Sequence, residues 1–148
     1  MTTNKKKITS HNLRITARLD IKGDKVVKGI NLEGIRKVGD PKILAKKYYN
    51  QGIDEIIYMD VVASLYGRNT ITEFIKETAK EIFVPLTVGG GIRNLSDIRS
   101  VLKSGADKVA INTQAIKKPE IIKEASEAVG SQAIVLSIEA KKQANSIW

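Results

Sequence analysis

Two segments of the chain, YYNQGIDEIIYMD (48–60) and VLKSGADKVAINT (101–113), follow one pattern. Each runs from the end of a helical stretch through a glycine, an apolar residue and an aspartate into an apolar strand. Strands that alternate with helices in this way form parallel sheets with right-handed crossovers. Because the unit occurs twice, the sequence favours a (β/α)8 TIM barrel over a doubly wound α/β sheet.

The rest of the chain alternates in the same manner. We predict strands at 13–21, 55–64, 84–90, 107–113 and 132–140, a hairpin arm at 25–31, and helices at 41–52, 70–82, 94–105 and 119–130. A complete barrel needs eight βα units and about 250 residues. Four units plus a fifth strand therefore predict the first half of a barrel, a truncated unit over 13–148 that follows a flexible arm at 1–12.

Local signals mark the ends of two predicted helices. Asp40 is suited to cap the first helix, with Pro41 at its first position and Gly52 just past its end. Asn94 and Ser96 are both candidates for the cap of the helix at 94–105.

Composition excludes several kinds of chemistry. The chain has no cysteine and one histidine, His11, in the polar arm, so thiolate sites, Ser–His–Asp triads and histidine-rich metal clusters are excluded. We expect no metal and no cofactor. No apolar stretch approaches the roughly 20 residues of a membrane helix. We therefore expect a cytoplasmic location with no membrane partner.

The formal net charge is +9, which is compatible with nucleic acid, an acidic membrane or a phosphorylated small molecule. The lysines are scattered over predicted helix faces, and aromatic residues are too scarce for a base-stacking platform. We therefore favour solubility and attraction of phosphate, and expect no nucleic-acid partner.

Ligand groups in such barrels lie at the carboxyl ends of the strands. There the stretch LTVGGGIRN (86–94) carries Gly89, Gly90 and Gly91, and a neighbouring strand ends in Asn112 and Thr113. Backbone N–H groups, an amide and a hydroxyl suit a phosphate, assisted by nearby helix N-termini. The alternative is that the glycines only make tight turns into helices.

Carboxylates end other strands of the predicted sheet. Asp20 and Glu139 would face each other across a barrel mouth, where two carboxylates can divide acid and base roles. Alternatively, each of them caps a helix or pairs with a lysine. For Asp60 we favour a capping role.

Six motifs together resemble the cyclase subunit of imidazole glycerol phosphate synthase over nearly all of residues 13–142. They are RLDIKGDKVVKGIN (18–31), GDP (39–41), DEIIYMDVVAS (54–64), PLTVGGGIRN (85–94), GADKVAINT (105–113) and GSQAIVLSIEAKK (130–142). The sister isomerase of histidine biosynthesis is less similar. The resemblance implies a barrel that binds a two-phosphate ribosyl substrate and uses ammonia delivered through the barrel by a docked glutamine amidotransferase (glutaminase) subunit. The products would be imidazole glycerol phosphate and aminoimidazole carboxamide ribotide.

The resemblance also implies roles for particular residues. Asp20 matches the first catalytic aspartate, and Glu139 falls where the second belongs. The remaining matches are the phosphate ligands Gly90, Gly91, Asn112 and Thr113, the substrate-loop lysine Lys28, the ammonia-gate residues Arg14, Glu55 and Lys108, and Asp107 as a residue that helps to dock the glutaminase.

Two positions depart from the family pattern. Arg18 stands where the family usually has cysteine, and Glu139 is one methylene longer than the aspartate expected there. Residues 18 and 20 alternate to one strand face, so Arg18 should point into the barrel and needs an anionic partner, Glu139 or Asp20. We treat the two changes as coupled and Arg18 as a specificity candidate.

Two alternative functions follow from these departures. RITARLDIKG (14–23), VVASLYGRN (61–69) and SIEA (137–140) are similar to paralogues that deliver ammonia to a nucleotide sugar in surface-glycan biosynthesis. In the family, another phosphate site and a fourth gate residue lie in the second half of the barrel, which the predicted half barrel lacks. The other alternative is therefore an inactive half barrel that only binds a partner.

Overall fold

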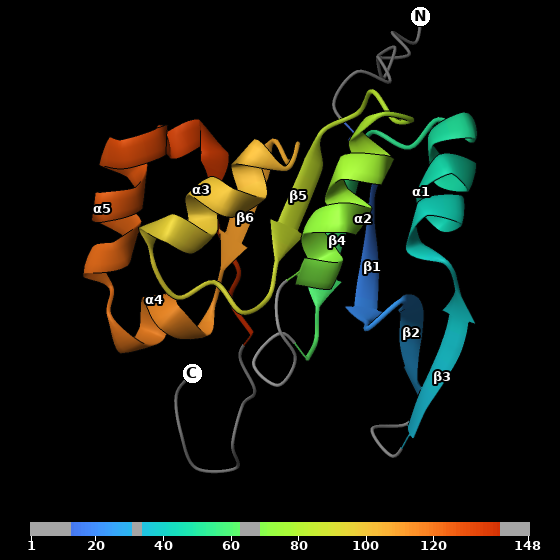
Figure 1. Ribbon diagram of the computed structural model, residues 1–148, viewed down its shortest axis with the longest axis horizontal. Coiled ribbons are helices and arrows are strands. Elements are labelled where there is room, and N and C mark those ends of the chain that lie inside the picture. The colour runs from blue at the N-terminus through green and yellow to red at the C-terminus, as the bar shows by residue number, and fades with distance from the viewer. Residues whose placement is uncertain (1–12, 31–33, 63–68, 140–148) are drawn as a thin grey trace, which may run out of the picture.

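The computed structural model describes residues 13–30, 34–62 and 69–139, and the predicted arm at 1–12 lies outside them. The described strands form one seven-stranded sheet in the order β3-β2-β1-β4-β5-β6-β7 (Figure 1). Neighbouring strands from β1 to β7 are parallel, namely β1 (Thr16–Lys22), β4 (Glu55–Asp60), β5 (Leu86–Gly89), β6 (Lys108–Ile111) and β7 (Ile134–Leu136). The predicted alternation of parallel strands with helices is confirmed.

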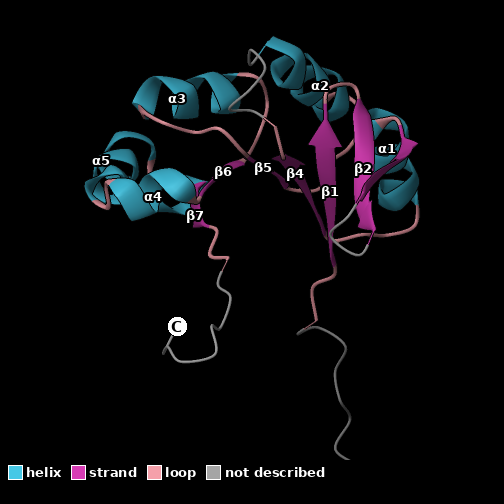
Figure 2. Cartoon of the chain, turned by 90° about the horizontal axis from the view of Figure 1, so that it is seen from below, coloured by secondary structure: helices cyan, strands magenta, loops and turns pink. Residues whose placement is uncertain are grey.

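The helices lie on one side of this sheet. Figure 2 shows the strands as an arc with the helices along its outer side, as in part of a barrel wall. The helices are α1 (Pro41–Asn50), α2 (Asn69–Ala79), α3 (Leu95–Lys103), α4 (Thr113–Lys117) and α5 (Glu120–Val129), and η2 (Ser131–Ala133) is a short 3-10 turn.

The prediction of one hairpin arm at 25–31 was incomplete. Two strands, β2 (Lys25–Ile30) and β3 (Gly34–Gly39), pair antiparallel and extend the sheet beyond β1. The second strand, GIRKVG, is short, carries two cations and is bounded by glycines. It therefore lacks the apolar run by which strands are recognised.

Several predicted strands were too long at their carboxyl ends. Strand β4 ends at Asp60, and β6 ends at Ile111, where the chain enters the unpredicted helix α4. Strand β7 spans only Ile134–Leu136, so Glu139 lies beyond it. An apolar run predicts a strand but does not show where pairing with the neighbouring strand stops.

The repeated Gly-x-Asp pattern forms the same structure twice. Asp54 donates its N–H to the Ile15 carbonyl at 3.0 Å, and its side chain accepts the Ile15 N–H at 2.7 Å. Asp107 and Leu86 repeat this exchange at 2.9 and 2.8 Å. We call each exchange an aspartate latch. Each latch joins the residue just before one strand to the start of the neighbouring strand segment. It therefore sets the register of a parallel pair of strands.

Helix caps agree with the sequence. The Asp40 side chain accepts the N–H groups of Lys42 and Ile43 at the start of α1. Of the two candidates for α3, Asn94 is the cap and forms a reciprocal capping box with Asp97. Each cap fixes where a helix begins after its strand and loop.

The core is one apolar layer between the sheet and the helices. Ile56 and Val109 from the strands pack in one buried cluster with Ile75, Ile98 and Ile121 from the helices. No helix in the described segments is long and apolar enough to cross a membrane.

Tyr58 is the largest fully buried side chain in that layer. Its hydroxyl donates to the Pro41 carbonyl at 3.0 Å and lies 2.8 Å from the Thr78 hydroxyl, so it connects β4 to α1 and α2. Burial raises the pKa of Tyr58 to about 12, although the Thr78 hydrogen bond opposes this shift.

Replacing Tyr58 with phenylalanine should lower the free energy of unfolding by about 1–2 kcal/mol, because buried polar partners lose their hydrogen bond. Urea unfolding at pH 7 measures the change. The matched control is Tyr48→Phe, since the Tyr48 hydroxyl makes no hydrogen bond with the described residues. Equal effects of the two substitutions would contradict the role of Tyr58.

The same comparison has a pH dependence. The pKa of Tyr58 is higher in the folded state than its ordinary value of 10.0, so its contribution is complete below pH 10. That contribution should be lost as the pH rises from 10 towards 12, and the difference between wild type and Tyr58→Phe should shrink there.

Candidate active site

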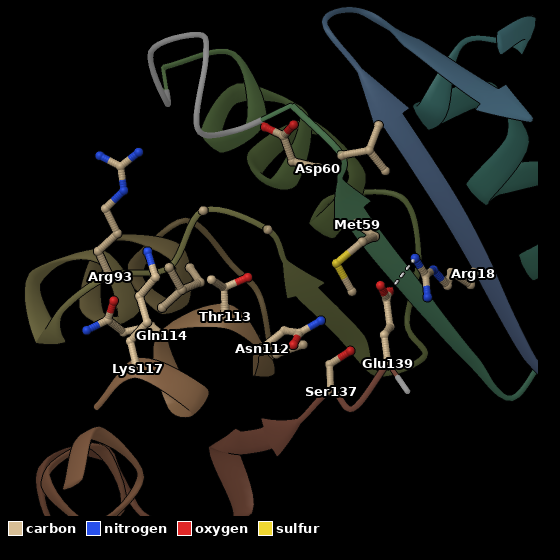
Figure 3. A pocket seen from close by; sticks show the side chains of 15 residues that line it. Arg18, Met59, Asp60, Arg93, Asn112, Thr113, Gln114, Lys117, Ser137 and Glu139 are labelled. Carbon is tan, nitrogen blue, oxygen red and sulfur yellow. Dashed lines mark ion pairs between the residues drawn. The ribbon is translucent and has the colours of Figure 1, made fainter. Parts of the chain in front are cut away.

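A cavity of about 620 Å³ lies at the carboxyl ends of β4, β5, β6 and β7 (Figure 3). Its lining combines backbone at the glycine run with charged and polar side chains. The lining residues are Arg18, Met59, Asp60, Val61, Gly90, Gly91, Ile92, Arg93, Ala110, Asn112, Thr113, Gln114, Lys117, Ser137 and Glu139. The cavity therefore brings together most of the residues predicted for substrate binding.

The glycine run leaves β5 in a conformation that side chains do not tolerate. Gly90 has φ +100° and Gly91 has φ +64°. A Cβ on Gly90 would overlap the backbone of Asp60, and one on Gly89 would lie 2.9 Å from Met59 and Ala110 side-chain atoms. The backbone of Gly90 and Gly91 therefore borders the cavity with no side chain over it, which is what close approach of a ligand requires.

Asn112 and Thr113 border the same part of the cavity. Asn112 stands at the start of α4, yet its side chain makes no capping hydrogen bond, in contrast to Asn94 at the start of α3. Helix-start asparagines normally cap. Asn112 instead leaves its amide available at the cavity wall (Figure 3).

The predicted carboxylates meet through Arg18. The Arg18 Nε lies 2.8 Å from Asp20 Oδ1. One of the terminal nitrogens of Arg18 lies 3.6 Å from Glu139 Oε1, and Figure 3 shows this second pair. Both candidate partners of Arg18 are thus used at once. Arg18 and Glu139 line the cavity, whereas Asp20 adjoins it through Arg18. We call these three residues the carboxylate end of the cavity.

Asp60 makes a local backbone contact, but it does not cap a helix as we favoured from the sequence, because the next helix, α2, begins only at Asn69. The Asp60 Oδ1 accepts the Val62 N–H at 2.9 Å and stabilises the bend after β4. The same residue also lines the cavity.

The structure adds four polar residues that the sequence analysis did not single out. Arg93, Gln114 and Lys117 lie together at the end of the cavity away from Glu139, and Ser137 lies beside Asn112 (Figure 3). The position of Arg93, two residues after the glycine run, was a usable signal. Gln114 and Lys117 had none, because they lie on the unpredicted helix α4.

A second cluster forms at the opposite, amino-terminal ends of the strands, and we call it the Glu55 cluster. One Glu55 oxygen accepts hydrogen bonds from Lys108 Nζ at 2.9 Å and from the Thr87 hydroxyl at 2.8 Å. The other oxygen accepts one from Arg14 at 3.0 Å. The three predicted gate residues are therefore in contact, and Thr87 is an addition to them.

The Glu55 side chain is only 12% exposed, so its charge depends on these partners. Burial acts to raise the pKa of Glu55. Hydrogen bonds from Lys108 and Thr87 and the charges of Lys108 and Arg14 outweigh burial, and the pKa lies below its ordinary value of 4.5.

Two other predicted residues lie outside these clusters. Lys28 was predicted in a loop, but it lies in β2 opposite Arg36 of β3, is exposed, and does not line the cavity. The pairing of β2 with β3 is what orders this segment. Asp107 forms the second aspartate latch at the amino-terminal ends of the strands. Within the described residues, no cluster of acidic or histidine side chains is suited to a metal ion.

The fold and cavity define an α/β-barrel unit with a polar, partly cationic site at the carboxyl ends of its parallel strands. The model of the histidine biosynthesis protein family matches residues 14–148, and the chain belongs to that family. This match confirms the half-barrel fold expected from the repeated βα unit.

Curated relatives agree with this assignment. Proteins named imidazole glycerol phosphate synthase subunit HisF are similar to the chain in Legionella pneumophila (56% identity, 93% of this chain and 65% of the relative) and Thermococcus onnurineus (50%, covering 86% and 51%). One from Methanococcus vannielii is 50% identical over 87% of this chain and 47% of its own length. The resemblance to the cyclase subunit is confirmed, and the chain spans about half to two thirds of these relatives.

Replacing Glu55 with glutamine should lower the free energy of unfolding at pH 7 by about 1–2 kcal/mol, because Lys108 loses its charged partner. Since the folded-state pKa of Glu55 is lowered, its contribution exists above pH 4.5 and is lost as the pH falls through the folded value.

Chemical unfolding at pH 7 and at pH 3.5 tests both statements. The control Glu73→Gln removes an exposed carboxylate on α2 that has no ion pair with a described residue, and should change little. A Glu55→Gln deficit that is equally large at both pH values would contradict the ionic origin.

Proposed function

We propose that this chain is a cyclase-type synthase unit of histidine biosynthesis. It uses ammonia on a phosphorylated ribosyl substrate to form imidazole glycerol phosphate and aminoimidazole carboxamide ribotide. The observation that carries the proposal is one cavity with a carboxylate end and a glycine-lined, cationic end. The names of the relatives at 50–56% identity support it.

Asp20 and Glu139 are the proposed acid and base. Asp20 lies on β1 and Glu139 follows β7, far apart in the sequence. Arg18 contacts both carboxylates and so holds them at the same side of the cavity. Proton transfer by a positioned carboxylate contributes typically about 10²–10⁴-fold to a rate. The phosphate is proposed to lie on Gly90, Gly91, Asn112 and Thr113, and Lys28 would contact the substrate from the hairpin.

The Glu55 cluster is the proposed ammonia entrance. It lies at the opposite strand ends from the cavity, on the same strands β4, β5 and β6. A glutaminase subunit is the proposed ammonia source and would dock beside it. A hollow there, lined by Phe83, Pro85, Gly105 and Asp107, includes the 80% exposed side chain of Phe83. A cytoplasmic location goes with this proposal.

A second candidate acceptor is a nucleotide sugar in surface-glycan biosynthesis. The observation that favours it is the Arg18–Glu139 ion pair, which joins the two residues that depart from the cyclase pattern. The proposed chemistry of the carboxylates and the phosphate site would be the same with either acceptor.

The substitution Asp20→Asn in the polypeptide that carries this chain should reduce turnover by at least about 100-fold, because the carboxylate that transfers the proton is lost. Steady-state formation of imidazole glycerol phosphate from the ribosyl substrate with ammonium salt is the measurement. The control is Asp24→Asn, which removes an exposed carboxylate whose one ion pair within the described residues is with its neighbour Lys25. Unchanged turnover would remove Asp20 from the mechanism. A wild-type polypeptide that binds glutaminase without turnover would support the inactive half barrel.

The paired substitution of Arg18 with cysteine and Glu139 with aspartate should shift preference towards the histidine intermediate, because it removes the ion pair as a unit. Competition between the ribosyl substrate and a nucleotide sugar measures the ratio of kcat/KM values, with each single substitution as the control. Additive effects of the two singles would contradict coupling.

A further inference from the structure

We propose that Arg93 and Lys117 form a cationic clamp over the phosphate of the substrate, with Gln114 at the same end of the cavity as a hydrogen-bond donor. The inference rests on the proposed function only for the choice of a phosphorylated ligand. It assigns binding roles to residues at the end of the cavity away from Glu139.

The clamp residues come from two separate elements. Arg93 lies in the connection between β5 and α3, and Gln114 and Lys117 are three residues apart on one face of α4. All three line the cavity and gather at one end of it (Figure 3). The Arg93 N–H donates to Asp97 Oδ2 at 2.9 Å, which fixes the backbone that carries the guanidinium.

The charges of the clamp are not used within the described structure. Neither Arg93 nor Lys117 forms an ion pair with any described residue, whereas the adjacent Lys118 pairs with Glu124 at 2.8 Å. Arg18, the other cation of the cavity, is paired with Asp20 and Glu139. Within the described residues these two cations therefore have no ion-pair partner, and they lie at the end of the cavity away from Asp20 and Glu139.

The surroundings select a phosphate oxyanion. Gly90 and Gly91 border the cavity without a side chain, and the Asn112 side chain beside them makes no capping hydrogen bond. A phosphate offers several strong acceptor oxygens and about −1.5 to −2 charges at pH 7. Two cations and several polar donors on one side match that group, and a neutral sugar would leave both cations without a partner.

Isothermal titration calorimetry measures the affinity for inorganic phosphate at constant ionic strength and tests the clamp directly. Lys117→Gln and Arg93→Gln should each weaken binding on the order of tenfold, because a charge-assisted contact is lost. The matched controls are Lys118→Gln and Arg99→Gln, which remove the same charges from exposed positions outside the cavity. These controls should stay within about twofold of wild type.

Equal losses in the clamp and control variants would mean that only net charge matters, and would overturn the clamp. So would wild-type protein that does not bind phosphate, or clamp variants that bind it normally. Circular dichroism confirms that each variant is folded. Because binding is measured without turnover, failure of the clamp and failure of the proposed reaction are distinguishable.

Two further probes identify the source of the phosphate. Ribose 5-phosphate represents the ribosyl substrate, and uridine diphosphate represents a nucleotide sugar. The clamp requires that Lys117→Gln weaken whichever of these probes binds more tightly to the wild-type protein. A normal affinity of the variant for that probe would overturn the assignment.

Discussion

The aspartate latches are the constraint on which the rest of the structure depends. Asp54, just before β4, exchanges two hydrogen bonds with Ile15, just before β1, and Asp107, just before β6, does the same with Leu86, the first residue of β5. A slip of one residue would turn every side chain of a strand to the other face. The latches fix the start of β4 against β1 and the start of β6 against β5. They therefore decide which side chains meet at the amino-terminal and carboxyl ends of the strands.

The two ends of the strands differ in how their charged side chains are paired. At the amino-terminal ends of the strands Glu55 is almost buried, and its two oxygens accept hydrogen bonds from Arg14, Lys108 and Thr87, so both cations share one negative charge. At the carboxyl ends of the strands, Arg93 and Lys117 lie at the opposite end of the cavity from Arg18, Asp20 and Glu139. A closed ion-pair cluster suits a structural or gating role. A cavity with uncompensated charge suits an ionic ligand.

Strand alternation explains which parts of the site were predictable. Arg18 and Asp20 are two residues apart on β1, so their placement on one face followed from the pleat, and Asp20 was one of two predicted partners of Arg18. The gate residues were predicted from a resemblance, and their contacts agree with their positions near the starts of β1, β4 and β6. Lys28 was misplaced because the pairing of β2 with β3 depends on a second strand with no apolar run.

The sequence by itself determined the parallel α/β architecture, the half-barrel class, the helix caps at Asp40 and Asn94, and the glycine run that borders the cavity. These features depend on local periodicity, on capping geometry and on backbone freedom, all of which are written in neighbouring residues. Only the tertiary structure decided that Arg18 contacts Asp20 and Glu139 together, that Thr87 joins Glu55, and that Arg93 and Lys117 share one end of the cavity. Those contacts join segments distant in the chain, and the short helix α4 that positions Lys117 leaves no periodic signal, because five residues make little more than one turn.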